Sequence, residues 1–559
     1  MKNLNPIAAS LAAPGAPYEF METEIDGVTM RVFKNAPQNM VKALDKSRAE
    51  FTDAEFIVSG DLRMTFGEYY KKVDALSGWL QNVANVQPKQ HVAIAMKNCA
   101  EWMIAFTAVL QIGAVAVLVN SKGEGQTMLN AVEDGDSVFL LCDEKRMALL
   151  REAGCELPGL IAEQAVGDES FALACASDSG FSMPEILPDD TACLFFTSGT
   201  TGRAKAAVIC HRSLVSGMMN TQMALEEAFT RIAMAYEISV EELAKHLPQT
   251  VSLMVFPLFH MSGCTSVFLT ALFGGNKLVL MDRWDGKELL RLTEKEKISS
   301  IGGVPAMHWD ILNAMKETDY DLSSVRSISC GGQAFPLNLI EALQEAFPNI
   351  VLGAGYGMTE TTGAISSSNG EAFAKKPDSS GQIFPMVDVR IVGENGEDLP
   401  NYESGEIYAR GPLIMKGYHK RPDATAEVLI DGWMKTGDIG FRDDDDYLFI
   451  IDRKTDMVIS AGENIYCVEV EQTLSQNPKV KEMAAFGAPD ERLGERLVIV
   501  VSPADESLTS DELMAFAQEN LAAYKVPSEI IIAKDVFTYN AMQKIEKKIL
   551  RAKYLNSEL

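Results

Sequence analysis

Short apolar runs alternate with amphipathic segments from Met64 onward, and this alternation constrains the fold more than any other feature. Residues 66–83 have helical periodicity, whereas residues 91–96, 137–142 and 278–281 are short runs that favour buried strands. Strands that are apolar on both faces need helices on both sides of their sheet. The first part of the chain therefore predicts βα units and mainly parallel sheets.

The pattern changes twice further along the chain. After Gln382 short strands and turns indicate a smaller β-rich body, and after residues 452–455 a compact set of strands with one helix follows. A chain of 559 residues is too long for one core. We therefore predict a large α/β domain over residues 1–454, with two mainly parallel sheets, flanking helices and a β-barrel-like subdomain. Residues 455–559 are predicted to form a small, mobile α+β domain.

Two segments have compositions that a membrane helix or a metal site would also have, namely residues 102–119 and 443–446. Residues 102–119 are apolar enough for a membrane helix, but polar residues interrupt them, so a buried helix followed by a buried strand is favoured. The four aspartates 443–446 lie between two apolar runs, where a hairpin tip is expected. Adjacent carboxylates on a turn diverge, which disfavours a metal site there.

The composition argues against several classes of partner. A net charge of −28 opposes binding to nucleic acid or anionic lipid, although a small anionic ligand could still bind in a locally positive site. Nine cysteines occur singly, without a C-x-x-C pair, which favours a reducing compartment. The first 20 residues lack the apolar stretch of a signal peptide. We expect a cytoplasmic protein without an integral membrane segment.

Residues 197–205, Thr-Ser-Gly-Thr-Thr-Gly-Arg-Ala-Lys, follow the apolar run 192–196. Glycine lets backbone N–H groups approach an anion closely, the hydroxyls add donors, and Lys205 supplies a positive charge. These groups predict a phosphate-binding loop that does not fit the Walker pattern. Taken alone, the loop could equally be an ordinary connection from a strand to a helix.

Four further strings support a nucleotide site. Residues 355–361 combine an aromatic ring, glycines, a hydroxyl and a carboxylate, which suit a base, a phosphate and Mg²⁺. Asp438 can accept hydrogen bonds from both hydroxyls of a ribose. Residues 452–465 and Lys544 complete the set. Each string alone has a structural explanation, but their joint occurrence in this order favours one site.

In this order the strings resemble the adenylate-forming superfamily of acyl-CoA synthetases, luciferases and peptide-synthetase adenylation domains. The match runs from about Met64 to the C-terminus. The resemblance implies an ATP-dependent acid:CoA ligase that forms an acyl-adenylate and pyrophosphate, then a CoA thioester and AMP. Its ligands would be ATP, Mg²⁺, CoA and a fatty or ring-bearing carboxylic acid, and a homodimer is compatible with it.

The resemblance also implies roles for individual residues. Lys544, Thr359 and Glu360 would be catalytic: Lys544 would bridge the substrate carboxylate and the α-phosphate, and Glu360 would bind Mg²⁺. The residues implied to bind ATP are Thr197, Ser198, Gly199, Thr200, Thr201, Gly202, Lys205, Gly332, Gln333, Ala334, Tyr356, Gly357, Asp438 and Arg453. The residues implied to line the acyl pocket are His260, Met261, Cys264, Val304, Gly332, Gly357, Met358 and Gly363. The residues implied to line a CoA tunnel, after rotation about a hinge near 454–455, are Ser460, Ala461 and Gly462.

Some residues depart from the family pattern. Ala204 and Cys467 replace prolines, which affects loop rigidity, and Gln543 replaces a glycine, which could restrict how Lys544 enters the site. Cys264 stands where long-chain enzymes often have a tryptophan, so the length of the acid stays open. Residues 224–250 form a longer segment than usual and predict a helical pair near the acyl entrance.

Three other functions remain open from the sequence. The protein could transfer the acyl group to a separate carrier protein, bind a nucleotide without turnover, or catalyse an oxidative light-emitting reaction. The joint presence of Lys205, Glu360, Asp438 and Lys544 disfavours the second of these.

Overall fold

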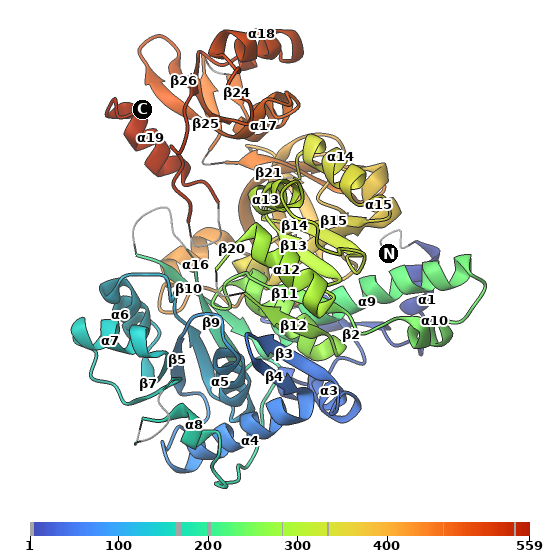
Figure 1. Cartoon of the computed structure of the whole chain (residues 1–559), viewed down its shortest axis with the longest axis vertical. Coiled ribbons are helices and arrows are strands. Elements are labelled where there is room, and N and C mark those ends of the chain that lie inside the picture. The colour runs from blue at the N-terminus through green and yellow to red at the C-terminus, as the bar shows by residue number, and fades with distance from the viewer. Residues whose placement is uncertain are drawn as a thin grey trace.

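The structure is a computed structural model that describes residues 5–163, 167, 169–197, 203–281, 283–332, 335–454, 456–461, 463–540 and 544–559. Figure 1 shows a small C-terminal domain, coloured orange to red, beside a larger body that contains most of the chain. The predicted mixed α/β architecture is confirmed. Within the described ranges no helix is both long and apolar enough to cross a membrane.

The first large sheet has six strands in the order β10-β9-β6-β5-β7-β8, and only the β9–β10 pair is antiparallel. Val92 and Ile94 face one core while Ala93 and Ala95 face another, which explains the continuous apolar run. The strands are β5 (His91–Ala95), β6 (Val115–Leu118), β7 (Ser137–Cys142), β8 (Gly159–Ile161), β9 (Thr191–Thr197) and β10 (Lys205–Cys210). The helices packed against them are α4 (Phe66–Asn82) and α5 (Ala100–Gln111) on one face, and α6 (Gly125–Asp134) and α7 (Glu144–Glu152) on the other.

The second large sheet has nine strands in the order β17-β16-β15-β14-β13-β11-β12-β3-β4, parallel from β15 to β3. One core lies between the two large sheets, and a second lies under the outer helices. The strands are β3 (Glu55–Ser59), β4 (Leu62–Thr65), β11 (Val251–Met254), β12 (Lys277–Leu280), β13 (Ser300–Gly303), β14 (Ser327–Gly331), β15 (Val351–Met358), β16 (Gly363–Asn369) and β17 (Gln382–Ile383). The outer helices are α12 (Gly286–Glu296), α13 (Pro305–Met315), α14 (Leu337–Ala346) and α15 (Gly370–Lys375).

Several local predictions are confirmed. Residues 66–83 contain α4, whose first turn is closed by a capping box: Glu68 N donates to Thr65 Oγ1 (3.2 Å) and Thr65 N donates to Glu68 Oε2 (2.8 Å). The apolar segment 102–119 is the buried helix α5 followed by strand β6.

The β-rich body is an antiparallel sheet built on β21, which pairs with β19, β20 and β22. Its strands are β18 (Asp388–Val392), β19 (Gly405–Arg410), β20 (Leu429–Ile430), β21 (Trp433–Arg442) and β22 (Leu448–Arg453), and α16 (Pro422–Val428) precedes β20. The four aspartates form the predicted tip between β21 and β22. Lys376 Nζ contacts two of their carboxylates, Asp443 at 2.6 Å and Asp445 at 2.8 Å, so this tip is held by an ion pair.

The small domain has its own five-stranded sheet and core. Its elements are β23 (Val458–Ser460), β24 (Glu463–Ile465), α17 (Cys467–Leu474), β25 (Val480–Asp490), β26 (Gly494–Pro503), α18 (Ser510–Asn520), η3 (Ala523–Lys525), β27 (Glu529–Ile532) and α19 (Lys547–Leu555). It meets the large domain at Asp452, the penultimate residue of β22, whose Oδ2 accepts a hydrogen bond from Val468 N at 3.1 Å. Burial raises the pKa of Asp452 to about 6, against the opposing charge of Lys547.

The N-terminal segment packs against a long helix, α9 (His211–Ala235). Asn5 Nδ2 donates to Glu227 Oε1 at 2.8 Å, and Tyr18 Oη donates to Glu226 Oε2 at 2.9 Å. The predicted helical pair is present as α9 and α10 (Val240–His246), although its first helix already begins at His211. The remaining elements are α1 (Pro6–Leu11), β1 (Phe20–Ile25), β2 (Val28–Phe33), α2 (Met40–Ala43), α3 (Asp45–Glu50), α8 (Phe171–Ala174), η1 (Ser262–Leu269), α11 (Thr270–Gly274) and η2 (Thr359–Thr361).

Candidate functional site

The predicted site lies where parallel strands of the nine-stranded sheet end. Strands β13, β14 and β15 are followed directly by Val304, Gly332 and Thr359, and β11 leads to His260. The carboxyl ends of parallel strands share one edge, which is where open α/β sheets bind their ligands. The topology therefore brings together residues that are far apart in the sequence.

A carboxylate, a phenol and a guanidinium meet beside this edge. Asp438 and Arg453 face each other across the β21–β22 pair, with Arg453 Nε 3.4 Å from Asp438 Oδ1. Tyr356 Oη, on β15, donates to Asp438 Oδ2 at 2.5 Å. Burial raises the pKa of Asp438 and the Arg453 charge opposes that shift. The cluster presents a buried hydrogen-bond acceptor next to an aromatic ring, as a nucleoside site requires.

Lys544 reaches the same edge from the small domain. A Cβ atom on Gly332 would lie 2.9 Å from Lys544 Nζ, so a larger residue would prevent this close approach. Gly332 also has a φ of +77°, a backbone conformation that favours glycine. Asn540 accepts from Lys544 N through its Oδ1 at 3.1 Å, which fixes the start of this segment. The lysine therefore joins the large-domain cluster, while Gln543 lies outside the described residues.

The charge on Lys544 is expected to depend on pH. Burial and, to a smaller extent, the Arg453 charge lower its pKa to about 8, whereas Asp438 and Cys330 act in the opposite direction. The pKa of His260 is lowered mainly by burial and to a smaller extent by the charge of Lys544. Because a lysine with a lowered pKa is charged below that value and neutral above it, any step that needs its charge weakens as the pH rises through 8.

We therefore expect kcat/KM for ATP in adenylate formation to fall as pH increases above about 8, since this parameter reports the free enzyme. The Lys544→Arg variant, whose side chain stays charged, should lose this alkaline limb even if its rate is lower. Pyrophosphate release between pH 6 and pH 10 measures both profiles. An identical alkaline limb in the arginine variant would assign the titration to another group.

The predicted phosphate loop joins two antiparallel strands. Residues 198–202, five of its predicted ligands, lie outside the described residues, but Thr197 and Lys205 pair across β9 and β10. The alternative of a strand-to-helix connection is therefore wrong. Lys205 Nζ lies 5.0 Å from the centre of the Tyr418 ring, and Tyr418 Oη donates to Glu360 Oε1 at 2.8 Å. Tyr418, which no sequence motif marks, thus connects the loop lysine to the predicted Mg²⁺ ligand.

Glu360 fits a magnesium ligand. It is 6% exposed, and burial raises its pKa, so its carboxylate lacks full compensation for its charge. Mg²⁺ in nucleotide sites commonly binds one or two carboxylates together with substrate phosphates. Thr359, beside it in η2, is also buried. The Glu360 carboxylate, connected to Lys205 through Tyr418, therefore suits a Mg²⁺ ion that also binds the phosphates of a nucleotide.

The predicted acyl residues come from several segments at or near this sheet edge. His260 leads into the π-helix η1, and its lowered pKa of about 4 keeps the imidazole neutral at pH 7. Met261, Cys264 and Val304 are buried. A Cβ on Gly357 would lie 2.0 Å from Gly363 O, so the close pairing of β15 with β16 at this position requires glycine. Gln333 and Ala334 lie outside the described residues.

The predicted CoA residues are elsewhere in the small domain. Ser460 ends β23 and Ala461 follows it in the turn toward β24, where Ala461 N donates to Leu493 O at 2.8 Å. Gly462 and Thr455 lie outside the described residues. In this arrangement Lys544 is the small-domain residue placed beside Gly332.

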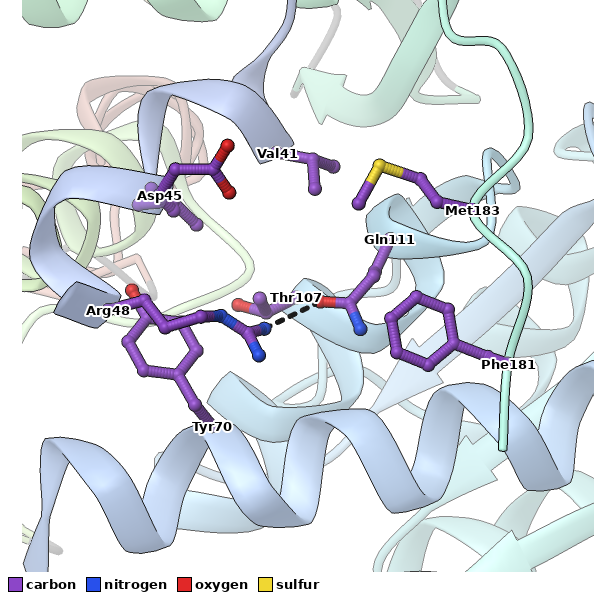
Figure 2. A pocket seen from close by; sticks show the side chains of 9 residues that line it. Val41, Asp45, Arg48, Tyr70, Thr107, Gln111, Phe181 and Met183 are labelled. Atoms are coloured by element: carbon purple, nitrogen blue, oxygen red, sulfur yellow. Dashed lines mark hydrogen bonds between the residues drawn. The ribbon is translucent and has the colours of Figure 1, made fainter. Parts of the chain in front are cut away.

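A separate cavity of about 160 Å³ lies near the N-terminal helices (Figure 2). Arg48 projects into it and donates to Gln111 Oε1 at 3.0 Å, while Gln111 Nε2 donates to Asp74 at 2.8 Å. Arg48 also pairs with Asp74 at 2.7 Å. These polar groups satisfy one another, so the cavity is part of the packing of α3, α4 and α5.

Fold and residue placement together are typical of an enzyme whose two domains contribute side chains to one nucleotide site. The chain belongs to the AMP-binding enzyme family: the family model matches residues 44–419, and that of the AMP-binding enzyme C-terminal domain matches residues 469–538. The predicted resemblance to adenylate-forming enzymes is thereby confirmed.

Similar proteins include several CoA ligases. Feruloyl-CoA synthase from Amycolatopsis sp is 34% identical over 84% of this chain and 90% of its own length. A Rhodococcus jostii CoA ligase for a dioxo-octahydroindenyl propanoate is 30% identical over 92% of this chain and 98% of its own. The structure of o-succinylbenzoate CoA synthetase from Bacillus subtilis with its acyl-adenylate superimposes with a TM-score of 0.75, at 27% identity, covering 92% of this chain and 97% of that one.

Proposed function

We propose that the protein is an ATP-dependent acid:CoA ligase that activates a fatty or ring-bearing carboxylic acid through an acyl-adenylate. The observation that carries this proposal is the approach of Lys544, from the small domain, to Gly332 beside Asp438 and Tyr356. Relatives named for ring-bearing acids favour that class of substrate. A cytoplasmic location is part of the proposal and is supported by the free cysteines.

In the first step the substrate carboxylate attacks the α-phosphorus of ATP and pyrophosphate leaves. Asp438 and Arg453 hold the ribose, and Lys205 with the loop hydroxyls holds the β- and γ-phosphates. Thr359 contacts the α-phosphate, and Lys544 stabilises the charge that develops between the carboxylate and the α-phosphate. Mg²⁺, when bound at Glu360, neutralises charge on the phosphate oxygens.

In the second step the CoA thiol attacks the acyl carbon and AMP leaves. For this step residues 455–559 act as a lid that rotates relative to residues 1–454 about a hinge near Lys454. Lys544 leaves the site and the Ser460–Ala461 turn replaces it. A lid that excludes water strengthens charge interactions in the first step, because they weaken in a high dielectric.

Pyrophosphate release across a panel of carboxylic acids, with and without CoA, tests the proposed function. We expect acid-dependent release, stimulation by CoA and a CoA thioester as product. Pyrophosphate exchange without any thioester would favour a carrier protein as acceptor. Light emission with oxygen would favour an oxidative enzyme, and the absence of exchange with every acid would leave nucleotide binding alone.

Changing Glu360 to Gln tests the magnesium site. The amide keeps the shape and can still accept from Tyr418, but it lacks the negative charge that attracts Mg²⁺. We expect the Mg²⁺ concentration for half-maximal pyrophosphate release to increase about tenfold or more. Glu371→Gln, at an exposed glutamate on α15, is the matched control and should leave the Mg²⁺ dependence unchanged. An unaltered Mg²⁺ titration in Glu360→Gln would remove this residue from the metal site.

A further inference from the structure

Asn220, on α9, is a buried side chain whose hydrogen-bonding groups are unsatisfied. The residue is 1% exposed, and within the described residues neither Oδ1 nor Nδ2 of its amide has a hydrogen-bond partner. Buried amides are normally paired, because an unpaired buried donor or acceptor costs stability. An amide with both groups unpaired therefore indicates that a bound ligand supplies the missing hydrogen bonds.

A second unsatisfied group lies in the turn that this helix approaches. Thr362 follows the catalytic segment Thr359–Thr361, is 2% exposed, and has no partner for its Oγ1 among the described residues. Gly217, one helical turn before Asn220, brings the helix close to this turn, since a Cβ there would lie 3.1 Å from Thr362 O. Positions three residues apart share a helix face. Asn220 and Thr362 thus belong to facing elements.

These facing elements adjoin the predicted acyl pocket. Ala224, on the same face of α9, packs against the core cluster of the β-rich body, which includes Ile365 of β16 and which Met358 and Ala364 also contact. A Cβ on Gly363 would lie 3.5 Å from Thr265 Oγ1, which is in the π-helix after Met261. Met358 and Gly363, which are implied to line the acyl pocket, therefore lie next to the segment that faces α9.

We infer that Asn220 and Thr362 select a carboxylic acid that carries a hydroxyl group away from its carboxylate. A hydroxyl both donates and accepts, so it can satisfy Oδ1 and Nδ2 of the amide together, which a hydrocarbon tail cannot do. A site with buried polar groups discriminates strongly against an analogue that leaves them unpaired. The inference rests on the proposed function and deepens it by naming the substrate class.

Matched pairs of acids test the inference: cinnamate with 4-hydroxycinnamate, 3-phenylpropanoate with 3-(4-hydroxyphenyl)propanoate, and octanoate with 8-hydroxyoctanoate. In at least one pair we expect kcat/KM for the hydroxylated acid to exceed that of its partner about tenfold or more. Asn220→Leu, of similar size, should reduce this ratio at least about tenfold, and Thr362→Val should reduce it in the same direction. Met234→Ala, at an exposed position on α9, is the control and should leave the ratio unchanged.

Thermal unfolding of the unliganded enzyme provides a readout independent of activity. Replacing an unpaired amide with an apolar group of similar shape should maintain or raise the Tm, whereas an amide needed for folding would give a lower Tm. Activation of both members of every pair with equal kcat/KM, an unaltered ratio in Asn220→Leu, or a lower Tm would overturn the inference but leave the ligase activity standing. Failure to activate any acid would overturn the proposed function, and the inference with it.

Discussion

Replacing Lys544 with Ala is expected to lower the rate of acyl-adenylate formation about 10²-fold or more. Two unit charges 4 Å apart interact by about 1 kcal/mol in water, but by about 4 kcal/mol at an effective dielectric of about 20. The partly buried position of Lys544 beside Gly332 favours the larger value. A loss of about 2.7–4 kcal/mol, typical of one preorganised donor, corresponds to a factor of about 10² to 10³.

The second half-reaction distinguishes this role from a structural one. Thioester formation from supplied acyl-adenylate and CoA should remain near the wild-type rate, because in the proposed mechanism the lysine leaves the site before that step. Pre-steady-state assays of both half-reactions measure the difference. Lys548→Ala, at an exposed lysine on α19, is the control and should affect neither step. Equal losses in the two half-reactions would contradict the assignment of Lys544.

Replacing Asp438 with Ala is expected to lower kcat/KM for ATP about 10²-fold or more. A charged acceptor contributes about 1.5–3 kcal/mol per hydrogen bond, and Asp438 can serve both ribose hydroxyls. The substitution also leaves Tyr356 Oη and Arg453 without their shared acceptor. Steady-state kinetics and direct nucleotide binding measure this loss.

Unlike the lysine variant, Asp438→Ala should impair both half-reactions, because the acyl-adenylate retains the ribose. Tyr356→Phe should have a smaller effect, since it removes one partner of the carboxylate and keeps the ring. Asp445→Ala, at the exposed tip between β21 and β22, is the control. An unchanged affinity for ATP in Asp438→Ala would place the ribose elsewhere.

Much of the fold could be predicted because local sequence and burial agree. Successive residues of β5 point to opposite faces of the sheet, and the side chains on both faces are apolar and buried. Thr65 and Glu68 form the capping box that marks the start of α4. The loop 197–205 was ambiguous because Gly and Thr suit several connections. Its position between antiparallel strands follows from the pairing of β9 with β10, in which Thr197 is opposite Lys205.

The site was predictable as a set of motifs, but its supporting contacts were not. Asp438 and Arg453 come together through strand register, which follows from the hairpin tip at residues 443–446. Tyr418 has no local sequence feature that marks it as a partner of Glu360, 58 positions away. Asn220 lies in an amphipathic helix, where an asparagine is unremarkable until its burial is known.

The contact between Asp452 and Val468 has a consequence for motion between the domains. Asp452 belongs to the last strand of the large domain, yet its carboxylate completes the first turn of α17 in the small one. Turning the small domain to admit CoA would detach this acceptor and expose a helix terminus. Loss of such a cap typically costs about 1 kcal/mol. In the proposed mechanism the two orientations would therefore differ in secondary-structure stability as well as in which residues face the nucleotide.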